Sequence, residues 1–550
     1  MAKKRRRTRG KRPDQSHKHD WGWLSPRVVA EGLLHSQTPD ERPWRFLLPV
    51  LALAFVARAS IALCGDFVLH PDEIMQHLEP AHLLVFGNGV TYWEFFYGAR
   101  AWLVPGAIAC ALSLFKVIGL GDPFWYVGGV KLMFCAISLL IPVGMYFFAR
   151  QHFGETSARF ALIGGAFWYE LVGFAHKPMT GFVSTALLLA LLALCVHPSR
   201  DRRWMVYLMA FVAVLASAVR WQYASVALPL LGLFFLITSR KKELVISSGV
   251  FFLAAGIFDS AMWNGSLFHS YLTNIRFNLV LHPLLEGESP AYQYLWWLWL
   301  ASAGLSVFCT TAALWEPRRH GLLLILLAVI LVSHSMQVHK EYRYVFATIP
   351  LWLLLGADVV ARLSVRVKRP RYLSGLFAVL FAAVSLCGIL NALPSQNQVY
   401  RAYSKETGKV QFIRDQDPVF AAYRYLAYAP GVLGVWHADR PYFNLPSYYY
   451  LHREIPFYDF STGRVINTGM ETTLASVSHI VAEYPNVVIP SYTVVKQFGD
   501  IRIWRRDEND APVRQWEVYN PIIVGGLEQV MKQVDPNAST PPADMGIKWR

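Results

Sequence analysis

The sequence has few charged residues: they make up 16% of its 550 residues, while hydrophobic residues make up 54%. An average soluble domain carries about 25% charged residues. This balance excludes a disordered chain, a coiled coil and a collagen. Because the apolar residues gather in long runs, the sequence predicts a polytopic α-helical membrane protein.

Cysteine is also scarce. The six cysteines each lie in or at the end of an apolar run, and no two have the spacing of metal ligands. They are Cys64, Cys110, Cys135, Cys195, Cys309 and Cys387. We interpret them as small buried hydrophobes, and we predict no metal site, no cofactor and no disulfide framework.

Eleven apolar runs are long enough to span a membrane. They are 45–64, 127–149, 160–175, 180–197, 204–219, 222–238, 245–262, 292–315, 320–335, 344–361 and 373–393. A further run, 101–118, is ambiguous, and we predict that it is a juxtamembrane or re-entrant segment. About eleven transmembrane helices, with helices lying along the outer surface, are therefore expected within residues 45–395.

The distribution of charge predicts the orientation of these spans. Residues 1–20 hold nine basic residues and two acids, which supply +7 of the net charge of +15. A nucleic-acid-binding arm is one interpretation of this tail, but a basic segment before a first span is typical of the cytoplasmic side. We therefore predict a cytoplasmic tail over 1–44 and no nucleic-acid partner. Short basic linkers, such as Arg200 to Arg203, then lie inside, and the alternate linkers lie outside.

Residues 396–550 differ in composition from the rest of the chain. Short β-rich runs alternate there with turn residues, which predicts a small soluble α/β domain on the luminal or periplasmic side. The runs are Val432–Trp436, Ser447–Leu451, Val487–Val495 and Ile501–Trp504.

The first outer loop, 65–100, carries the densest set of functional side chains. Pro71 suits the first residue of a helix, and Asp72 and Glu73 suit its first turn. In an α-helix, Asp72, Gln76 and Glu79 would share one face. His70 precedes this segment, and Glu94 and Arg100 follow it. A solvated polar loop is the simplest interpretation, but ionisable groups beside a membrane usually serve a function.

Other polar clusters are expected on the same side of the membrane. Arg220 and Asp259 lie at the outer ends of spans, and the segment His339 to Arg343 precedes the tenth span. Headgroup contacts explain an isolated arginine. His339, Lys340 and Arg343 are denser than anchoring requires, and their cations could bind a phosphate.

A carboxylate near cations at the membrane surface suits transfer of a group from a lipid phosphate to a hydroxyl. The carboxylate would accept the proton and the cations would stabilise the departing phosphate. A transporter or flippase of a lipid-linked saccharide is the alternative. Transporters often contain paired repeats with sites at the bilayer midplane, whereas the polar residues here gather at one face.

Two motifs together resemble glycosyltransferase family 22, the GT-C-fold mannosyltransferases of GPI-anchor and N-glycan assembly. The first is His70-Pro71-Asp72-Glu73 followed by Gly87-Asn88-Gly89 and Thr91-Tyr92-Trp93-Glu94; the second is His339-Lys340-Glu341-Tyr342-Arg343-Tyr344. The segment from Asp259 to Asn278 resembles a third family element, although Trp263-Asn264 stands where tyrosine is usual. The resemblance covers about residues 45–365, and Leu78 to Trp102 is most similar to the branch that adds the third mannose of the GPI anchor.

This resemblance implies an inverting glycosyltransferase that takes mannose from a polyprenyl-phosphate donor, such as dolichyl-phosphate mannose. The acceptor would be a lipid-linked glycan or glycolipid on the luminal or periplasmic face. By correspondence, Asp72 is the expected base, Glu73 positions the acceptor or the base, and His339, Lys340 and Arg343 lie near the donor phosphate. His70, Gln76, Glu79, Glu94, Arg100, Arg220 and Asp259 are expected to shape the site. The compartment is the endoplasmic reticulum or, as the Arg-, Ala- and Leu-rich composition suggests, a bacterial inner membrane.

Overall fold

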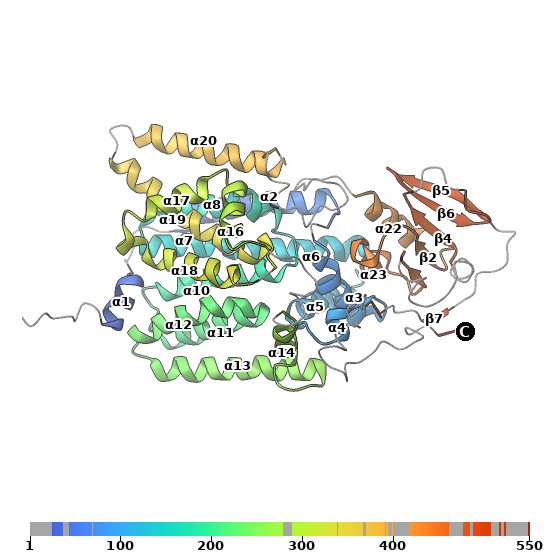
Figure 1. Ribbon diagram of the computed structural model, residues 1–550, viewed down its shortest axis with the longest axis horizontal. Coiled ribbons are helices and arrows are strands. Elements are labelled where there is room, and N and C mark those ends of the chain that lie inside the picture. The colour runs from blue at the N-terminus through green and yellow to red at the C-terminus, as the bar shows by residue number, and fades with distance from the viewer. Residues whose placement is uncertain are drawn as a thin grey trace, which may run out of the picture.

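The structure is a computed structural model that describes most of the chain. The described residues are 25–36, 43–68, 70–278, 289–337, 339–366, 370–390, 392–393, 399, 417–460, 477–483, 488–507, 516–518, 522–523 and 548–549. The basic segment 1–20 lies outside them, so its cytoplasmic location stays a prediction. Figure 1 shows a helical bundle along the long axis of the molecule, with α1 (Pro26–Leu33) at one end and a β-sheet beyond the other.

Every apolar run that the sequence singles out is helical. These helices are α2 (Trp44–Cys64), α6 (Pro123–Ser138), α7 (Leu140–His152), α8 (Glu155–Phe167), α9 (Tyr169–Gly173), α10 (Thr180–Cys195), α11 (Arg203–Val219), α12 (Ala224–Ile237), α13 (Lys241–Trp263), α16 (Gln293–Ala301), α17 (Leu305–Ala313), α18 (Pro317–Ser335), α19 (Thr348–Arg366) and α20 (Pro370–Ile389). Five of the described helical stretches are long and apolar enough to cross a membrane, or six if α16 and α17, bent by 110°, form one span. A polytopic membrane architecture is therefore supported, and the number eleven stays a prediction.

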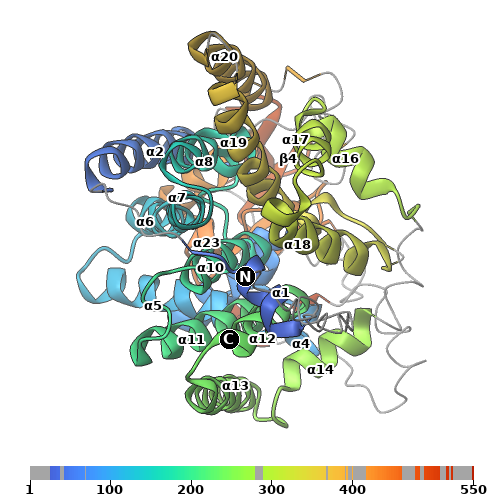
Figure 2. The same cartoon turned by 90° about the vertical axis from the view of Figure 1, so that its left-hand side faces the viewer.

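The bundle is built around α19, which packs on α7, α8, α17, α18 and α20. The view down the long axis shows the helices nearly end-on, with α20 and α13 at opposite margins (Figure 2). Buried leucine, alanine and aromatic side chains fill the space between them, and Trp168 packs edge-on against Trp352 at 5.0 Å between ring centroids. The surfaces of α2 and α13 keep large exposed apolar side chains, as expected of helices that face lipid.

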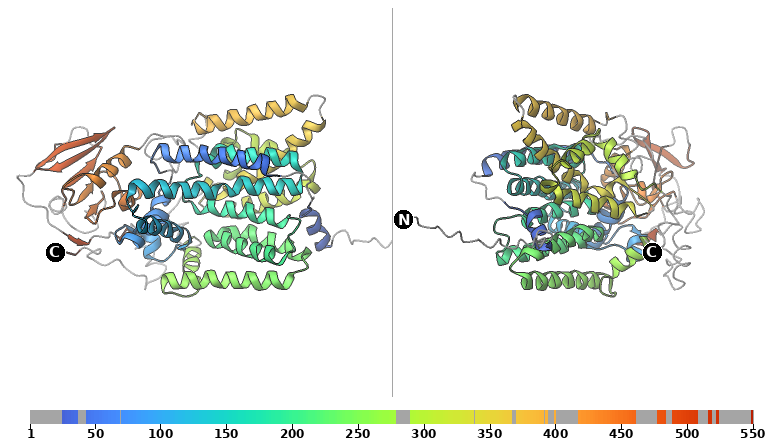
Figure 3. Two further views of the ribbon diagram at one scale, coloured as in Figure 1. Left: turned by 180° about the vertical axis from the view of Figure 1, so that it is seen from behind. Right: turned by 60° about the vertical axis from the view of Figure 1, so that its left-hand side comes forward.

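Short helices gather at the end of the bundle that faces the sheet. They are η2 (Glu73–Leu78), α3 (Glu79–Phe86), α4 (Trp93–Phe96), α5 (Leu103–Val117), η3 (Trp221–Tyr223), α14 (His269–Arg276) and η5 (Tyr342–Val345). The ambiguous run 101–118 forms α5, which packs on η2, α3 and α6. Figures 1 and 3 both place it at this end of the bundle, beside α3. Its position relative to the bilayer stays a prediction.

The C-terminal part contains a five-stranded mixed sheet, with order β3-β2-β4-β6-β5. Its elements are α22 (Pro418–Tyr428), β2 (Val435–His437), η7 (Tyr442–Asn444), α23 (Ser447–Leu451), β3 (Phe457–Tyr458), β4 (His479–Ala482), β5 (Tyr492–Phe498) and β6 (Ile501–Arg506). Further short strands are β7 (Trp516–Val518), β8 (Ile522–Ile523) and β9 (Lys548–Trp549). Strand β2 is parallel to β3 and β4, whereas β6 is antiparallel to β4 and β5. An α/β arrangement was predicted here, and the strand predicted at Ile501–Trp504 is confirmed.

One strand prediction in this part is wrong. Ser447–Leu451 forms α23, a short helix, rather than a strand. The tyrosines of this run favour β-structure on their own. The backbone N–H groups of Tyr448 and Tyr449 instead donate to the carboxylate of Glu79, at 3.1 and 3.0 Å. A carboxylate at the N-terminus of a helix satisfies its free donors, so this tertiary contact overrides the local preference.

A buried arginine binds the carbonyl groups at the end of α8, where the chain breaks before α9. Arg58 of α2 is fully buried, and its Nη atoms donate to the carbonyls of Gly165 and Ala166 at 3.0 and 2.6 Å. These carbonyls belong to the last turn of α8, whose helical hydrogen bonds end where Trp168 turns extended. An ionisable residue within a membrane span usually marks a functional site, but Arg58 has a structural role here.

Replacing Arg58 with leucine is expected to destabilise the bundle. The change leaves the Gly165 and Ala166 carbonyls unpaired, at a cost of about 1–3 kcal/mol each. The thermal unfolding midpoint of the purified protein should therefore fall by several degrees. Arg45→Leu, an exposed arginine of the same helix, is the control and should leave the midpoint nearly unchanged. Equal midpoints for the two variants would contradict this role for Arg58.

Candidate active site

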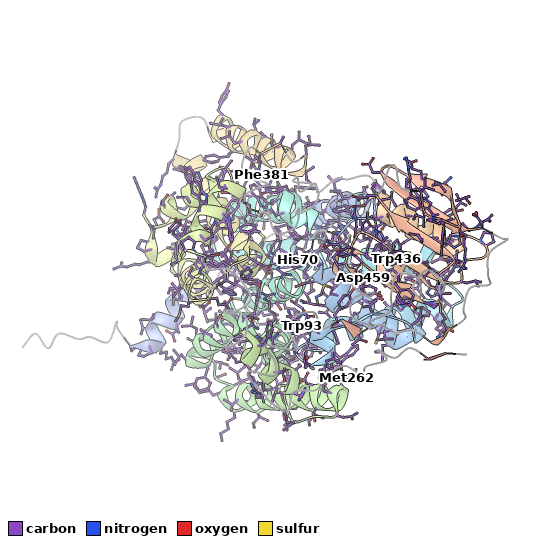
Figure 4. The ribbon with its side chains drawn as sticks, turned by 45° about the vertical axis from the view of Figure 1, so that its right-hand side comes forward. His70, Trp93, Met262, Phe381, Trp436 and Asp459 are labelled. Atoms are coloured by element: carbon purple, nitrogen blue, oxygen red, sulfur yellow. The ribbon has the colours of Figure 1, made fainter. Side chains whose placement is uncertain are left out.

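Two segments far apart in the sequence meet at an ion pair. Asp72 lies at the start of η2, and its Oδ2 is 2.5 Å from Nη1 of Arg343 in η5. His70 completes the contact, with Nδ1 at 3.0 Å from the same Nη1 and 3.2 Å from Oδ1 of Asp72. Glu341 also pairs with Arg343. Figure 4 shows His70 where the helical bundle meets the C-terminal part, which holds Trp436 and Asp459.

The local sequence explains where Asp72 is placed. Pro71 precedes the helix, and its carbonyl accepts from the N–H groups of Ile74 and Met75. The turn that follows is a π-helix rather than an α-helix. An additional residue in a turn rotates the downstream side chains by roughly 100°. The prediction that Glu79 shares a face with Asp72 and Gln76 is therefore wrong: Glu79 points toward α23, while Asp72 and Gln76 line a cavity.

This polar cavity is bounded by the first outer loop, by the segment that precedes α19, and by residues of α14 and the end of α11. Its charged and strongly polar lining residues are Asp72, Gln76, His77, Arg100, Thr180, Arg220, Gln222, Asn274, Asn278, Gln337 and Arg343. Trp221 and Tyr344 supply aromatic walls. A smaller apolar hollow adjoins it, lined by Phe174, Met179, Gly181, Phe182 and Phe346 together with Arg220 and Arg343.

The pKa values of two carboxylates of the site, Asp72 and Glu94, are shifted in opposite directions. Burial alone would raise the pKa of Asp72, but the Arg343 guanidinium and His70 hold that pKa well below its usual range. Burial raises the pKa of Glu94 to about 7, against the opposing effect of Arg100. Glu94 accepts from Nε2 of Gln76 at 3.1 Å, and its second oxygen has no hydrogen-bond partner among the described residues. Burial also lowers the pKa of His77 to about 3, so its imidazole is neutral.

Glu73 lies outside the cavity lining. Its Oε2 is 3.1 Å from Nζ of Lys177 and its Oε1 accepts from the N–H of His70 at 3.1 Å, with both charged side chains almost fully buried. Lys177 also donates to the carbonyl of Phe67 at 2.6 Å. Glu73 thus fixes the backbone on which His70 and Asp72 stand, which suits positioning of the base.

The side chains of three further predicted site residues form hydrogen bonds with backbone groups and do not line the cavity. Glu79 is fully buried and accepts from Val90, Tyr448 and Tyr449, and burial raises its pKa to about 7 despite these hydrogen bonds. Asp259 accepts from the N–H of Ser270 at 2.8 Å, at the start of α14. Lys340 donates to the carbonyls of Ser289 and Gln337, at 2.9 and 2.6 Å.

The remaining predicted residues lie at or beside the cavity. Gln76, Arg100, Arg220 and Arg343 line it, whereas His339 stands beside it, 3.3 Å from Glu341. Asn274 was not predicted: it accepts from Nε1 of Trp221 at 2.9 Å and donates to the carbonyl of Ala99 at 3.1 Å. Asn274 therefore joins α14 to the end of the first outer loop. An asparagine beside an aromatic-rich loop gives little sequence signal.

The comparisons with known proteins identify the family of the chain. The model of the Alg9-like mannosyltransferase family matches residues 45–416, more than half of the chain. The chain belongs to this family. It is 24% identical to human GPI alpha-1,2-mannosyltransferase 3 over 338 residues, 57% of this chain and 58% of the relative. It is 29% identical to GPI mannosyltransferase 3 of Trypanosoma brucei brucei over 370 residues, 57% of this chain and 65% of the relative.

A solved structure shows the same fold. The structure of ArnT from Cupriavidus metallidurans bound to undecaprenyl phosphate matches with a TM-score of 0.56 at 13% identity, over 86% of this chain and all of ArnT. The predicted GT-C fold of a polytopic membrane protein is thereby supported. Since the chain spans less than two thirds of the two curated relatives, their activity is a proposal for this protein.

The raised pKa of Glu94 predicts a pH dependence of stability. A carboxyl group whose pKa rises from its usual 4.5 to about 7 on folding binds more protons in the folded state between these values. This contribution to the free energy of unfolding therefore falls as pH rises from about 4.5 to 7. Glu94→Gln should therefore reduce the change in the thermal unfolding midpoint across this pH interval.

Glu79 contributes a slope of the same sign, so part of the dependence should remain in the Glu94 variant. Glu31→Gln, at an exposed position in α1, is the matched control and should follow the unmodified protein. If the Glu94 variant has the same pH profile as this control, the account of Glu94 is wrong.

Proposed function

We propose that the protein is an inverting glycosyltransferase that moves mannose from a polyprenyl-phosphate donor to a lipid-linked glycan or glycolipid. The supporting observation is the meeting of Asp72 and Arg343 in the wall of one polar cavity. Membership of a mannosyltransferase family favours mannose, and the GPI mannosyltransferase 3 relatives favour a mannosylated glycolipid acceptor. ArnT, which has the same fold, binds undecaprenyl phosphate, which favours a polyprenyl-phosphate donor here.

The residues can be assigned to the steps of a single displacement. The acceptor hydroxyl attacks the anomeric carbon of the sugar while Asp72 takes the hydroxyl proton. The bond between that carbon and the phosphate oxygen breaks, and its electron pair stays with the phosphate, which gains one negative charge. Arg343 stabilises this charge. Attack from the face opposite the leaving group inverts the anomeric configuration.

The ion pair with Arg343 also determines how strong a base Asp72 is. Before donor binding, Arg343 holds Asp72 ionised with a low pKa, which makes it a weak base. A donor phosphate competes for the Arg343 guanidinium, so the pKa of Asp72 rises when the donor is bound. Glu73, held by Lys177, keeps the loop in place during this exchange. Activation of the base is thus coupled to the presence of the donor.

The activity can be separated from that of a transporter with purified protein in detergent. The probes are polyprenyl-phosphate mannose with labelled sugar and a membrane lipid extract that contains mannosylated glycolipids. Transfer of label to a lipid without any sealed compartment supports the enzyme. Movement of the labelled donor across sealed vesicles without transfer would instead favour the transporter or flippase.

Asp72→Asn tests the assignment of the base. The turnover number should fall by about 10²–10⁴-fold, the usual contribution of general base catalysis, whereas the KM for the donor should not rise, because Arg343 loses its competing carboxylate. Size-exclusion behaviour and the unfolding midpoint should stay close to those of the unmodified protein. Asp500→Asn, an exposed carboxylate between β5 and β6, is the control. Unmodified turnover in Asp72→Asn would reject Asp72 as the base.

A further inference from the structure

Three arginines line the polar cavity, and they differ in their counter-ions. Arg343 pairs with Asp72 and Glu341, and Nη2 of Arg100 lies 3.9 Å from Oε1 of Glu94. Arg220 forms no ion pair with any described carboxylate, and its Nε has no hydrogen-bond partner among the described residues. A partly enclosed cation without a counter-ion is a candidate anion-binding group, because burial of an uncompensated charge is costly.

The surroundings of Arg220 hold its guanidinium in place without neutralising it. Nη1 lies 3.4 Å from Oγ1 of Thr180, a weak contact. The guanidinium lies 4.9 Å from the ring centre of Tyr344, and that of Arg343 lies 5.5 Å from the same ring. Burial lowers the pKa of Arg220, which a bound anion would oppose. Arg220 therefore shares one aromatic ring with Arg343, and the Nε of Arg220 can donate to an oxyanion.

The position of Arg220 and Arg343 determines how a phosphate bound between them would be oriented. Both line the polar cavity and both line the apolar hollow of Phe174, Phe182 and Phe346. Gly181 lies at this junction, where a Cβ atom would stand at van der Waals contact, 3.4 Å from the carbonyl of Arg343 and 3.8 Å from Nη1 of Arg220. A phosphate between the arginines would direct an apolar substituent toward the hollow and a polar one toward Asp72.

We propose that Arg220 binds the donor phosphate together with Arg343, and that the isoprenoid chain of the donor leaves the phosphate on the side of the apolar hollow. This inference rests on the proposed function and assigns a phosphate ligand different from Lys340, whose ammonium group is hydrogen-bonded to backbone carbonyls. When the bond between the sugar and the phosphate oxygen breaks, the electron pair passes to the phosphate. Arg220 then stabilises the additional negative charge together with Arg343.

The test measures binding of geranyl phosphate and of inorganic phosphate to the full chain purified in detergent. Arg220→Gln removes the cation, and Arg220→Lys keeps the charge but loses the planar fork. Arg276→Gln is the matched control, because Arg276 is an exposed arginine of α14 outside both cavity linings. The unfolding midpoints of all variants show whether they are folded.

The unmodified protein should bind geranyl phosphate more tightly than inorganic phosphate. Arg220→Gln should weaken geranyl phosphate binding by about 10–100-fold, as expected for loss of a charge-assisted hydrogen bond. The affinity of Arg220→Lys for geranyl phosphate should lie between those of Arg220→Gln and the unmodified protein. The affinity of Arg276→Gln should remain within about twofold of that of the unmodified protein. Equal binding by Arg220→Gln and Arg276→Gln overturns the inference alone. Failure of the unmodified protein to bind geranyl phosphate overturns the proposed function as well.

Discussion

The ion pair between Asp72 and Arg343 is the contact on which the rest of the site depends. It joins the first outer loop to the segment before α19, and both side chains are largely enclosed, at 15% and 12% exposed. Loss of Asp72 would still leave Arg343 with Glu341 as its counter-ion, whereas loss of Arg343 would deprive both carboxylates of their guanidinium partner. The two loops are therefore held at one wall of the cavity, and a phosphate that binds Arg343 must share it with Asp72. In this account one contact links assembly of the site, donor binding and control of the base.

Contacts around the cavity keep this pair in register. Glu73 and Lys177 fix the backbone beneath Asp72, and Asn274 holds the end of the same loop. Glu79 extends the connection to α23, and β8 pairs with β1 (Thr91–Tyr92) beside Trp93. Trp93, which Figure 4 labels, packs on Phe277 at 4.3 Å between ring centroids. The C-terminal part is thus attached to the loop that carries Asp72, the proposed base, and its stability bears on the geometry of the site.

Much of the fold could be predicted from the sequence, because long apolar runs have few alternatives to membrane helices. The pairing of a carboxylate at Asp72 with a cation at Arg343 was also within reach, since the basic linkers place both segments on one side. The partners of the other carboxylates were not. Glu73 and Glu79 lie in the same loop as Asp72, and Asp259 lies near the end of α13, yet these three carboxylates bind Lys177 or backbone N–H groups. The π-turn in η2 and the helix at Ser447–Leu451 depend on tertiary contacts, which local periodicity does not encode.

A cryo-electron microscopy map of the protein with a non-transferable polyprenyl-phosphate mannose analogue tests the central claim most directly. The account predicts the phosphate within hydrogen-bonding distance of the Arg343 guanidinium, the sugar in the polar cavity beside Asp72, and a longer separation of Asp72 from Arg343 than the 2.5 Å of the free protein. A phosphate bound away from Arg343, with the ion pair to Asp72 intact, would contradict it.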